Sequence, residues 1–404
     1  MFRYYNFIFL LLFVAVVING QNRKMTYSLN PGCLKICDNN TVLVHVAADG
    51  INDTLHHIWD FTSKPTVFLA LTPLNTELII DWENFLWNGE KGAVKFSNDI
   101  IYAFSVVFDK IIEYNDVNKT AQYNPTNNSE NYVTFLHPEF YNWTVERKQV
   151  TDNVITFVIK SSEYKYGNIT KTGNVKITLN AFGNSEHSSL QPHLLHTTNA
   201  TQIDFVLDRL QVKYSKSRYS LGLLITSTDQ KSSNLTQIKR KSLDDEHSPG
   251  IFTLGEVLTP VNVSSDKGGY LQWRTVAYTS SSRLMTNSTN VIETRARHVE
   301  FPVKRLNLTV VGSYFGEKLN LLPVHEMFVS FGAEEDGFYS KTGYLSWTVL
   351  AGLGRPAEEG FSLLVLLILA IGLGLPALLI IVGTVCIITR RVARKRDAIF
   401  ITNY

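Results

Sequence analysis

The densest cluster of titratable side chains in this sequence is Asp244-Asp245-Glu246-His247. Carboxylates beside a histidine can carry out acid–base hydrolysis, in which one group donates a proton and another activates water. The cluster lies inside a polar stretch, residues 227–248, whose composition predicts an exposed loop. A charged face in contact with solvent is therefore the simpler interpretation, and a hydrolase that uses Asp244 to His247 is kept as the alternative.

Two histidine pairs, His56-His57 and His193-x-x-His196, have types and spacings that occur in metal sites. Neither pair has a cysteine or a third ligand nearby in the sequence. Hydrogen-bonded or surface histidines are the simpler interpretation, so the sequence predicts no metal site.

Cys33 and Cys37 could form either a redox pair or a structural disulfide. Redox pairs usually have the spacing Cys-x-x-Cys at the start of a helix. A four-residue step separates two Cα atoms by about 13 Å in a strand but by about 6 Å in a helical turn, which is bridging distance. Pro31 and Gly32 favour a turn, so we predict a small structural disulfide between Cys33 and Cys37.

Several catalytic motifs are absent from the sequence: Gly-x-Ser-x-Gly, His-Glu-x-x-His and the phosphate-binding Walker loop. Gly352-Leu-Gly354 matches part of a dinucleotide-binding fingerprint, but Pro356 and a long apolar stretch follow instead of a helix of a βαβ unit. We therefore predict neither a catalytic site nor a cofactor. A net charge of +2 also argues against nucleic-acid binding, which usually requires a strong basic excess.

The two ends of the chain predict its topology in a membrane. Residues 1–20 combine a positive start at Arg3, an apolar core and a small residue at Gly20, which is typical of a secretory signal peptide. Residues 361–389 contain no charged side chain over 29 positions and predict a transmembrane helix. The tail 390–404 carries five basic residues and only one acidic residue, which places it in the cytosol.

The region between these ends, residues 21–360, is predicted to be outside the cytosol and heavily glycosylated. It contains eleven Asn-x-Ser/Thr sequons, about twice the number that chance would give, spread along its whole length. They are Asn39, Asn52, Asn118, Asn127, Asn142, Asn168, Asn199, Asn234, Asn262, Asn287 and Asn307. Because glycans need solvent, these asparagines are expected on loops or on outward faces.

The patterning of residues 21–360 predicts a mainly β fold, a sandwich-type domain followed by the single C-terminal transmembrane helix. Short alternating runs rich in β-branched and aromatic residues are separated by Asn, Gly, Ser and Pro. The clearest runs are 41–47, 66–72, 154–160, 174–180, 203–207, 219–226, 306–311 and 328–331. Residues 105–114 have apolar positions at near-helical spacing and predict a helix. The polar stretch 227–248 could divide the region into two β units.

Several segments resemble one family, the glycosylated lysosomal membrane proteins. They occur in the family's order along nearly the whole region: 54–59 (TLHHIW), 78–82 (LIIDW), 194–197 (LLHT), 242–252 (SLDDEHSPGIF), 272–278 (QWRTVAY) and 344–356 (YLSWTVLAGLGRP). The resemblance implies a type I lysosomal membrane protein with a glycosylated, mostly β lumenal domain. It further implies a non-enzymatic accessory subunit of a lysosomal major-facilitator transporter of dipeptides, which shields that partner from lumenal proteolysis.

Two features depart from this family. Vertebrate members have more lumenal cysteines, and Thr201 stands where one is expected, so their disulfide pattern does not transfer to this chain. Family tails present a Tyr-x-x-apolar sorting motif, whereas the only tail tyrosine here is the last residue, Tyr404. Delivery to the lysosome would then depend on the partner. Whether the chain forms a homo-oligomer is left open, and a receptor function is disfavoured by a fifteen-residue tail without a docking motif.

Overall fold

The computed structural model describes residues 22–38, 40–88, 91–242, 247, 250–251, 253–260, 267–358 and 367–401. The predicted signal peptide, the sequons Asn39 and Asn262, and Asp244 to Glu246 lie outside these residues. The chain divides into two units: a large β domain, made of the residues up to Lys241 and Thr253–Ala357, and a smaller unit, made of Ser242–Phe252 and the chain from Glu358 on, which contains the C-terminal helix.

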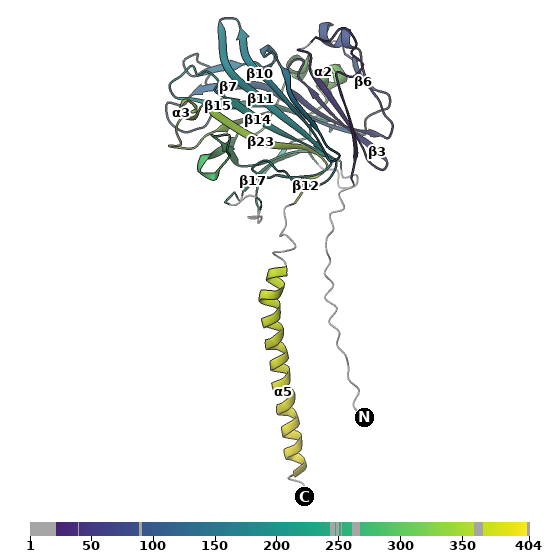
Figure 1. Ribbon diagram of the computed structural model, residues 1–404, viewed down its shortest axis with the longest axis vertical. Coiled ribbons are helices and arrows are strands. Elements are labelled where there is room, and N and C mark those ends of the chain that lie inside the picture. The colour runs from purple at the N-terminus through teal and green to yellow at the C-terminus, as the bar shows by residue number, and fades with distance from the viewer. Residues whose placement is uncertain are drawn as a thin grey trace. The chain divides into compact units, whose positions relative to one another are not determined.

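The β domain consists of two layers of antiparallel strands (Figure 1). The first layer runs, in spatial order, through β1 (Lys24–Leu29), β2 (Leu43–Asp49), β3 (Asp53–Asp60), β4 (Thr66–Pro73), β7 (Tyr102–Asn115), β15 (Ser217–Ser227) and β22 (Val324–Phe331). β8 (Val133–Leu136) pairs with the far end of β7. β20 (Ser288–Glu293) and β21 (Arg297–His298) both pair with β22.

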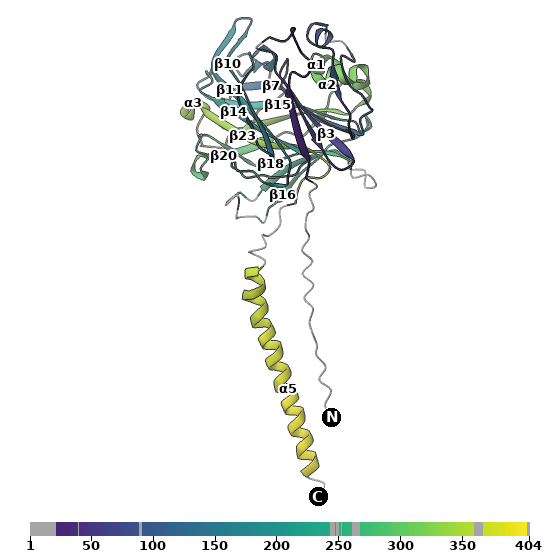
Figure 2. The same ribbon diagram turned by 45° about the vertical axis from the view of Figure 1, so that its right-hand side comes forward.

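The second layer contains the longest strands, and β10, β11, β14 and β23 lie side by side in Figure 1 and Figure 2. Its spatial order is β9 (Thr144–Val150), β10 (Val154–Tyr166), β11 (Ile169–Phe182), β14 (Ala200–Asp208), β23 (Tyr344–Leu353), β18 (Gly269–Arg274), β17 (Thr253–Leu258) and β16 (Thr236–Lys241). β19 (Val276–Tyr278) pairs with β23 of the second layer and with β20, which in turn pairs with β22 of the first layer. Backbone hydrogen bonds therefore connect the two layers through β19 and β20.

The main hydrophobic core lies between the two layers and is made by every second residue of their strands. Aromatic rings meet across it: Phe108 of β7 stacks on Phe205 of β14, with ring centroids 6.0 Å apart. Phe331 of β22 similarly contacts Trp347 of β23 at 5.8 Å. The predicted fold class, a mainly β sandwich-type domain with one C-terminal apolar helix, is therefore confirmed.

A second core covers the outer face of the first layer. It is built from the hairpin β5 (Leu78–Ile80) and β6 (Val94–Phe96), the π-helix η1 (Asn84–Asn88), α1 (Pro302–Leu306), α2 (Val310–Phe315) and the 3-10 helix η4 (Gly316–Leu321). Short elements complete the domain: β12 (Glu186–His187) with β13 (Leu195–His196), and η2 (Pro138–Phe140), η3 (Met285–Asn287) and α3 (Tyr339–Thr342). Strands of the first layer are thus buried on both faces over much of their length.

The helix predicted at 105–114 is wrong, because these residues form most of strand β7. The strand is buried on both faces, so apolar residues occupy adjacent positions instead of alternating. In addition, Gly222 of β15 pairs with Lys110 while Leu223 pairs with Phe108, which leaves Asp109 as the extra residue of a β-bulge. The bulge shifts the phase of the inward-facing residues, and together these two effects imitate helical spacing.

The suggested division near 227–248 does not separate two β units. Strands from both sides of it pair directly, as in β14 with β23 and β15 with β22, and both sides belong to one compact unit. Residues Thr236–Lys241, inside the predicted loop, form β16, which pairs only with β17 among the described strands. Its polar sequence, TQIKRK, is explained by this edge position, since most of its side chains remain in contact with solvent.

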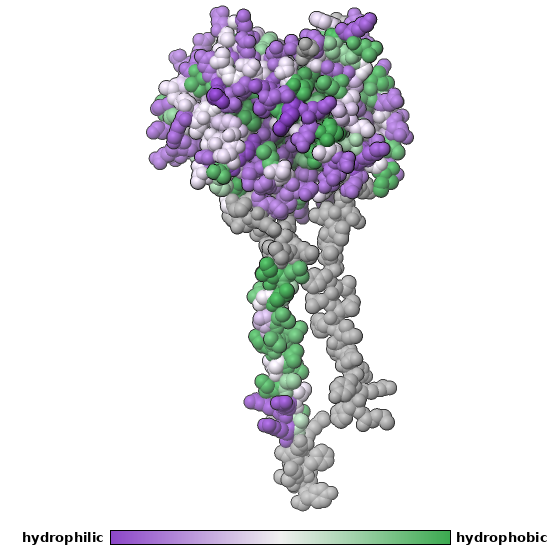
Figure 3. All heavy atoms as spheres, in the orientation of Figure 1, coloured by the Kyte–Doolittle hydropathy of each residue, from purple (hydrophilic) through white to green (hydrophobic). Residues whose placement is uncertain are grey.

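The C-terminal helix has a span, Leu367–Arg394, that is long and apolar enough to cross a membrane. Figure 3 shows its surface as mostly hydrophobic, with hydrophilic residues toward its C-terminal part. Residues Ala370–Gly374 form a π-helical turn, η5, before α5 (Leu375–Ile401). Pro376 lacks the backbone N–H that a regular helix requires, which accounts for the irregular turn before it. The helix continues through the basic residues to Ile401, past the predicted end at 389.

Candidate functional site

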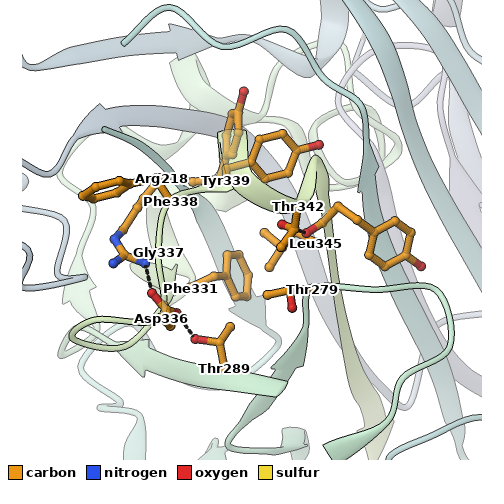
Figure 4. A pocket seen from close by; sticks show the side chains of 13 residues that line it. Arg218, Thr279, Thr289, Phe331, Asp336, Gly337, Phe338, Tyr339, Thr342 and Leu345 are labelled. Atoms are coloured by element: carbon orange, nitrogen blue, oxygen red, sulfur yellow. Dashed lines mark hydrogen bonds and ion pairs between the residues drawn. The ribbon is translucent and has the colours of Figure 1, made fainter. Parts of the chain in front are cut away.

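A small pocket is lined by Arg218 and Asp336, which belong to a buried network of charged groups (Figure 4). Arg218 extends from β15 toward Asp336, which lies in the loop after β22. Arg218 Nε donates to Asp116 Oδ2 at 2.8 Å, and Nη1 donates to Asp336 Oδ1 at 2.7 Å. Its Nη2 donates to the carbonyl of Ala333 at 3.0 Å. Thr289 donates in turn to the second oxygen of Asp336.

This pocket does not have the space for a substrate. Its volume is about 30 Å³, which leaves room for no more than a few water molecules. Each nitrogen of Arg218 already donates to a protein oxygen. Gly332 allows the guanidinium to approach the backbone, because a Cβ there would lie 2.2 Å from Arg218 Nη1. We interpret the cluster as a clamp: Arg218 of β15 holds the loop after β7, through Asp116, and the loop after β22, through Ala333 and Asp336. We call it the Arg218 clamp.

A second buried charge pair joins the two layers. Glu113 of β7 accepts a hydrogen bond from Lys171 Nζ of β11, and both side chains are almost completely buried. The other carboxylate oxygen of Glu113 accepts bonds from Ser217 Oγ and from the backbone N–H of Lys213, each at 2.5 Å. Because both oxygens of the carboxylate are engaged inside the core, this pair is also structural.

The histidine pair His56-His57 cannot bind one metal ion, because adjacent residues of a strand point to opposite faces. His56 Nδ1 lies 2.9 Å from His45 Nε2, and its Nε2 lies 3.0 Å from Thr72 Oγ1. His57 faces the main core, where its Nδ1 lies 2.7 Å from Thr201 Oγ1. Thr201, at the position where vertebrate relatives were expected to have a cysteine, is therefore a hydrogen-bonding partner of the core.

Burial makes these imidazoles difficult to protonate. It lowers the pKa of His45 to about 3, with a further contribution from His56, and it lowers the pKa of His56 to about 4. The pKa of His57 is lowered to about 3, first by burial and then by the nearby charge of Arg23. The three side chains are thus neutral in the folded domain well into the acid range.

The second histidine pair is also bonded within the domain. His193 Nδ1 lies 2.6 Å from the carbonyl oxygen of Ser188, and the ring of His196 stacks on Phe182 with centroids 3.4 Å apart. Burial lowers the pKa of His196 to about 4. Within the described parts of the chain, no group of three or more His, Cys, Asp or Glu side chains could hold a metal ion.

The remaining sequence candidates lie as follows. Cys33 and Cys37 are joined in a disulfide, with Cα atoms 6.1 Å apart. Of the Asp244–His247 cluster, only His247 is among the described residues, so the cluster's geometry cannot be compared with a hydrolase site. Gly352 belongs to β23, where a Cβ would lie 2.3 Å from the Tyr270 ring, so the glycine serves close packing between strands.

Nine of the eleven sequon asparagines are among the described residues, and seven of them are exposed to solvent. The exposed residues are Asn52, Asn118, Asn127, Asn142, Asn168, Asn234 and Asn307. Asn199 and Asn287 are half-buried, and Asn199 Oδ1 accepts a hydrogen bond from Arg23 Nε at 2.9 Å. The seven exposed side chains could be reached by a glycosylating enzyme, and their occupancy stays a prediction.

These features define a class: a β-sandwich domain rich in sequons, followed by one candidate membrane span. The family model described as "Glycosylated lysosomal membrane protein" matches residues 42–394, almost the whole chain. The chain belongs to this family, as the sequence resemblance predicted.

Relatives with this name are similar over nearly their full length. Protein A of Xenopus laevis is 30% identical over 381 residues, which cover 92% of this chain and 91% of the relative. Protein B of the same organism is 31% identical over 380 residues, covering 91% of this chain and 90% of the relative. The Homo sapiens protein is 26% identical over 391 residues, covering 93% and 90% respectively.

Solved structures give only a distant similarity. Galactose 1-epimerase from Lactobacillus acidophilus is 7% identical, covers 82% of this chain and all of its own, and superposes with a TM-score of 0.34. A mutarotase-like protein from Salmonella typhimurium is 8% identical, covers 77% of this chain and 91% of its own, and has a TM-score of 0.28. Similarity at this level says nothing about activity.

Proposed function

We propose that this protein is a non-enzymatic accessory subunit of a lysosomal major-facilitator transporter of dipeptides. In this proposal the β domain is lumenal, the helix crosses the membrane once as in a type I protein, and the basic tail is cytosolic. Membership of the glycosylated lysosomal membrane protein family carries the proposal. The family name does not itself mention a transporter, so the partner is inferred from the resemblance.

The geometry of the β domain is compatible with a shielding role. A protease needs a locally unfolded segment, and the strands of the domain are held in two packed antiparallel layers with a continuous core between them. Glycans on the exposed sequon asparagines would add bulk around the domain, where they would obstruct access to the partner. The buried charged groups of the Arg218 clamp and the Glu113–Lys171 pair are used in internal bonds, so they support rigidity instead of chemistry.

Contact with a multi-span partner would come from the β domain, the helix, or both. Ala370 and Gly374 form a small-xxx-small pair, which allows a neighbouring helix to approach closely. Contacts of this kind are individually modest, about 1 kcal/mol. A docked domain interface can bury more than about 1,000 Å². We therefore expect most of the association energy to come from the β domain.

The experiment measures the half-life of the transporter in lysosomes, together with co-purification from detergent. Gly374→Leu should weaken association without abolishing it, and replacing the whole span by an unrelated apolar helix should do the same. Gly383→Leu is the matched control. Gly383 lies nine residues after Gly374, and nine residues of an α-helix turn through two and a half turns, so its side chain would be on the opposite face of the helix. Deleting the β domain while keeping the span should abolish both association and protection. Full protection by the span and tail alone would refute the shielding mechanism.

The alternative function is a lumenal hydrolase that uses the Asp244–His247 cluster. It predicts a reproducible hydrolytic activity in the purified protein that is lost in Asp245→Ala while thermal unfolding is unchanged. The accessory-subunit proposal predicts no such activity and a stoichiometric multi-span companion in the same preparation.

A further inference from the structure

A charged groove lies on the outer face of the first layer and belongs to none of the clusters described above. It consists of two adjoining recesses of about 600 and about 360 Å³, which share Lys110, Arg305 and Glu326. The larger recess is also lined by Lys64, Asp109, His137, Glu139, His298, Glu300 and Lys304. The smaller is lined by Tyr123, Phe135, Arg295, Arg297 and Phe328, among others. We call the whole the basic groove.

The backbone creates this groove through two local features. The β-bulge in β7 makes Asp109 an extra residue and turns its side chain out of the regular alternation. Gly222 of β15 lies between Lys110 of β7 and Phe328 of β22 and pairs with both. Because glycine has no side chain, Gly222 places none between Lys110 and Phe328. Bulges that redirect a side chain are over-represented beside functional sites.

The floor of the groove is a compact ion network. Asp109 accepts hydrogen bonds from Lys64 Nζ, at 2.6 Å, and from Arg305 Nη2. Arg305 Nη2 also donates to Glu326 Oε1 at 2.6 Å. Burial alone would raise the pKa of Asp109, but Lys64, Arg305 and Lys110 outweigh it and hold the pKa below its ordinary value. Asp109 is therefore charged, and both Asp109 and Glu326 are already paired with cations of the groove.

The groove contains more cations than this network needs. Its lining includes six Lys and Arg side chains but four carboxylates. Arg295, Arg297 and Lys304 form no ion pair with any described residue. Arg305 donates to the described residues only through Nη2, so N–H donors at Nε and Nη1 are left over. Arg297 pairs in register with Glu326, which places both residues on the same face of the sheet.

The smaller recess combines these cations with an apolar wall. Tyr123 and Phe328 meet edge to face with centroids 5.3 Å apart, and Lys110 Nζ lies 5.6 Å from the centroid of Phe135. Guanidinium groups bind carboxylate and phosphate through paired N–H donors, and aromatic rings provide area for an apolar or planar body. We propose that the basic groove binds a small molecule that carries a phosphate or carboxylate on an apolar or planar body.

The proposal is tested on the full-length protein in a nonionic detergent with phenyl phosphate as the probe. Isothermal titration calorimetry should show saturable binding of phenyl phosphate, weaker binding of inorganic phosphate, and no binding of phenol. Affinity should fall as salt is added, because the charges that attract the probe are partly exposed. Equal binding of phenol would contradict an anion site, and no saturable binding of phenyl phosphate would overturn the proposal.

The double variant Arg295→Gln/Arg297→Gln removes two exposed charges that have no described partner, so folding should be unaffected. Each lost charge-assisted bond should weaken phenyl phosphate binding about tenfold. Arg147→Gln/Lys165→Gln, which removes two exposed cations outside the groove, is the matched control and should bind like the unmodified protein. If both double variants bind phenyl phosphate equally well, the groove is not the site and the proposal fails.

Discussion

Replacing Arg218 by methionine is the sharpest test of how the β domain is stabilised. The guanidinium is 4% exposed and neutralises two carboxylates, Asp116 at 3% and Asp336 at 19% exposed. Methionine keeps most of the side-chain length, and therefore the packing beside Phe338, whose ring lies 5.0 Å from the guanidinium carbon. The substitution thus removes the charge and the hydrogen bonds more than it removes volume.

Removing one partner of a buried ion pair typically costs about 3–5 kcal/mol, because the other charge stays buried without compensation. The two carboxylates would keep some partners. Asp116 Oδ2 accepts from the N–H of Ala121 at 2.9 Å, and Asp336 Oδ2 accepts from the N–H of Ala333 at 2.7 Å. We therefore expect the lower end, about 3 kcal/mol, which corresponds to a fall in Tm of roughly 4 °C for a domain of about 340 residues.

The assay is thermal and urea unfolding of the full-length protein in detergent, followed by tryptophan fluorescence. Arg209→Met is the matched control, because Arg209 is 86% exposed and its ion pair with Asp208 is 3.4 Å long. Exposed pairs contribute about 0–1 kcal/mol, so this variant should unfold almost like the unmodified protein. If Arg218→Met loses less than about 1 kcal/mol, or no more than the control, the clamp does not stabilise the domain as argued.

Three further predictions concern acidity, glycans and strand packing. Burial lowers the pKa of five histidines, namely His45, His56, His57, His196 and His325, to about 3 or 4. The unfolded chain binds protons on them below about pH 6.5, so stability should fall from pH 7 toward pH 4, by at most about 2 kcal/mol per histidine at pH 5. Burial raises the pKa of Asp60 to about 6, so this carboxyl group alone would make the domain more stable at lower pH and opposes the trend. The free energy of unfolding is measured by urea titration at pH 7.5 and pH 5. Equal values at the two pH values would contradict the predicted net loss of stability. Glycosidase treatment followed by mass spectrometry should show at least six of the eleven sequons occupied, whereas two or fewer would remove the shield argument. Gly352→Ala should lower Tm markedly, because its Cβ would overlap the Tyr270 ring, and an unchanged melting curve would show that the strands adjust freely.

The sequence predicted the family, the fold class and the apolar helix because these depend on patterns repeated over many residues. Alternation with period two marks strands such as β14, where Ile203, Phe205 and Leu207 face the core. An uncharged run of 29 residues likewise has few structural alternatives. A single residue that departs from such a pattern does not change the element that the pattern predicts.

The charged clusters could not be predicted because their members are distant in the sequence. Arg218, Asp116 and Asp336 meet only through the pairing of strands around β15 and β22, and Glu113 meets Lys171 across the two layers. Single charges inside apolar runs were the only available indication. Asp109 and Glu113 both interrupt the run 105–114, and each is buried in an ion pair.

The edges of the sandwich indicate how such a domain remains separate from other chains. Among the described strands, β1, β9 and β16 each pair with only one neighbour, so their outer backbone groups could accept another strand. β9 has the sequence TVERKQV and β16 has TQIKRK, and these polar and charged side chains are mostly exposed. Charged edge strands oppose strand addition, since pairing with another chain would bring like charges together or bury them. A domain whose charged edge strands β9 and β16 oppose strand addition, and whose internal charges are compensated, is suited to contact a partner through side-chain surfaces instead of through its sheet edges.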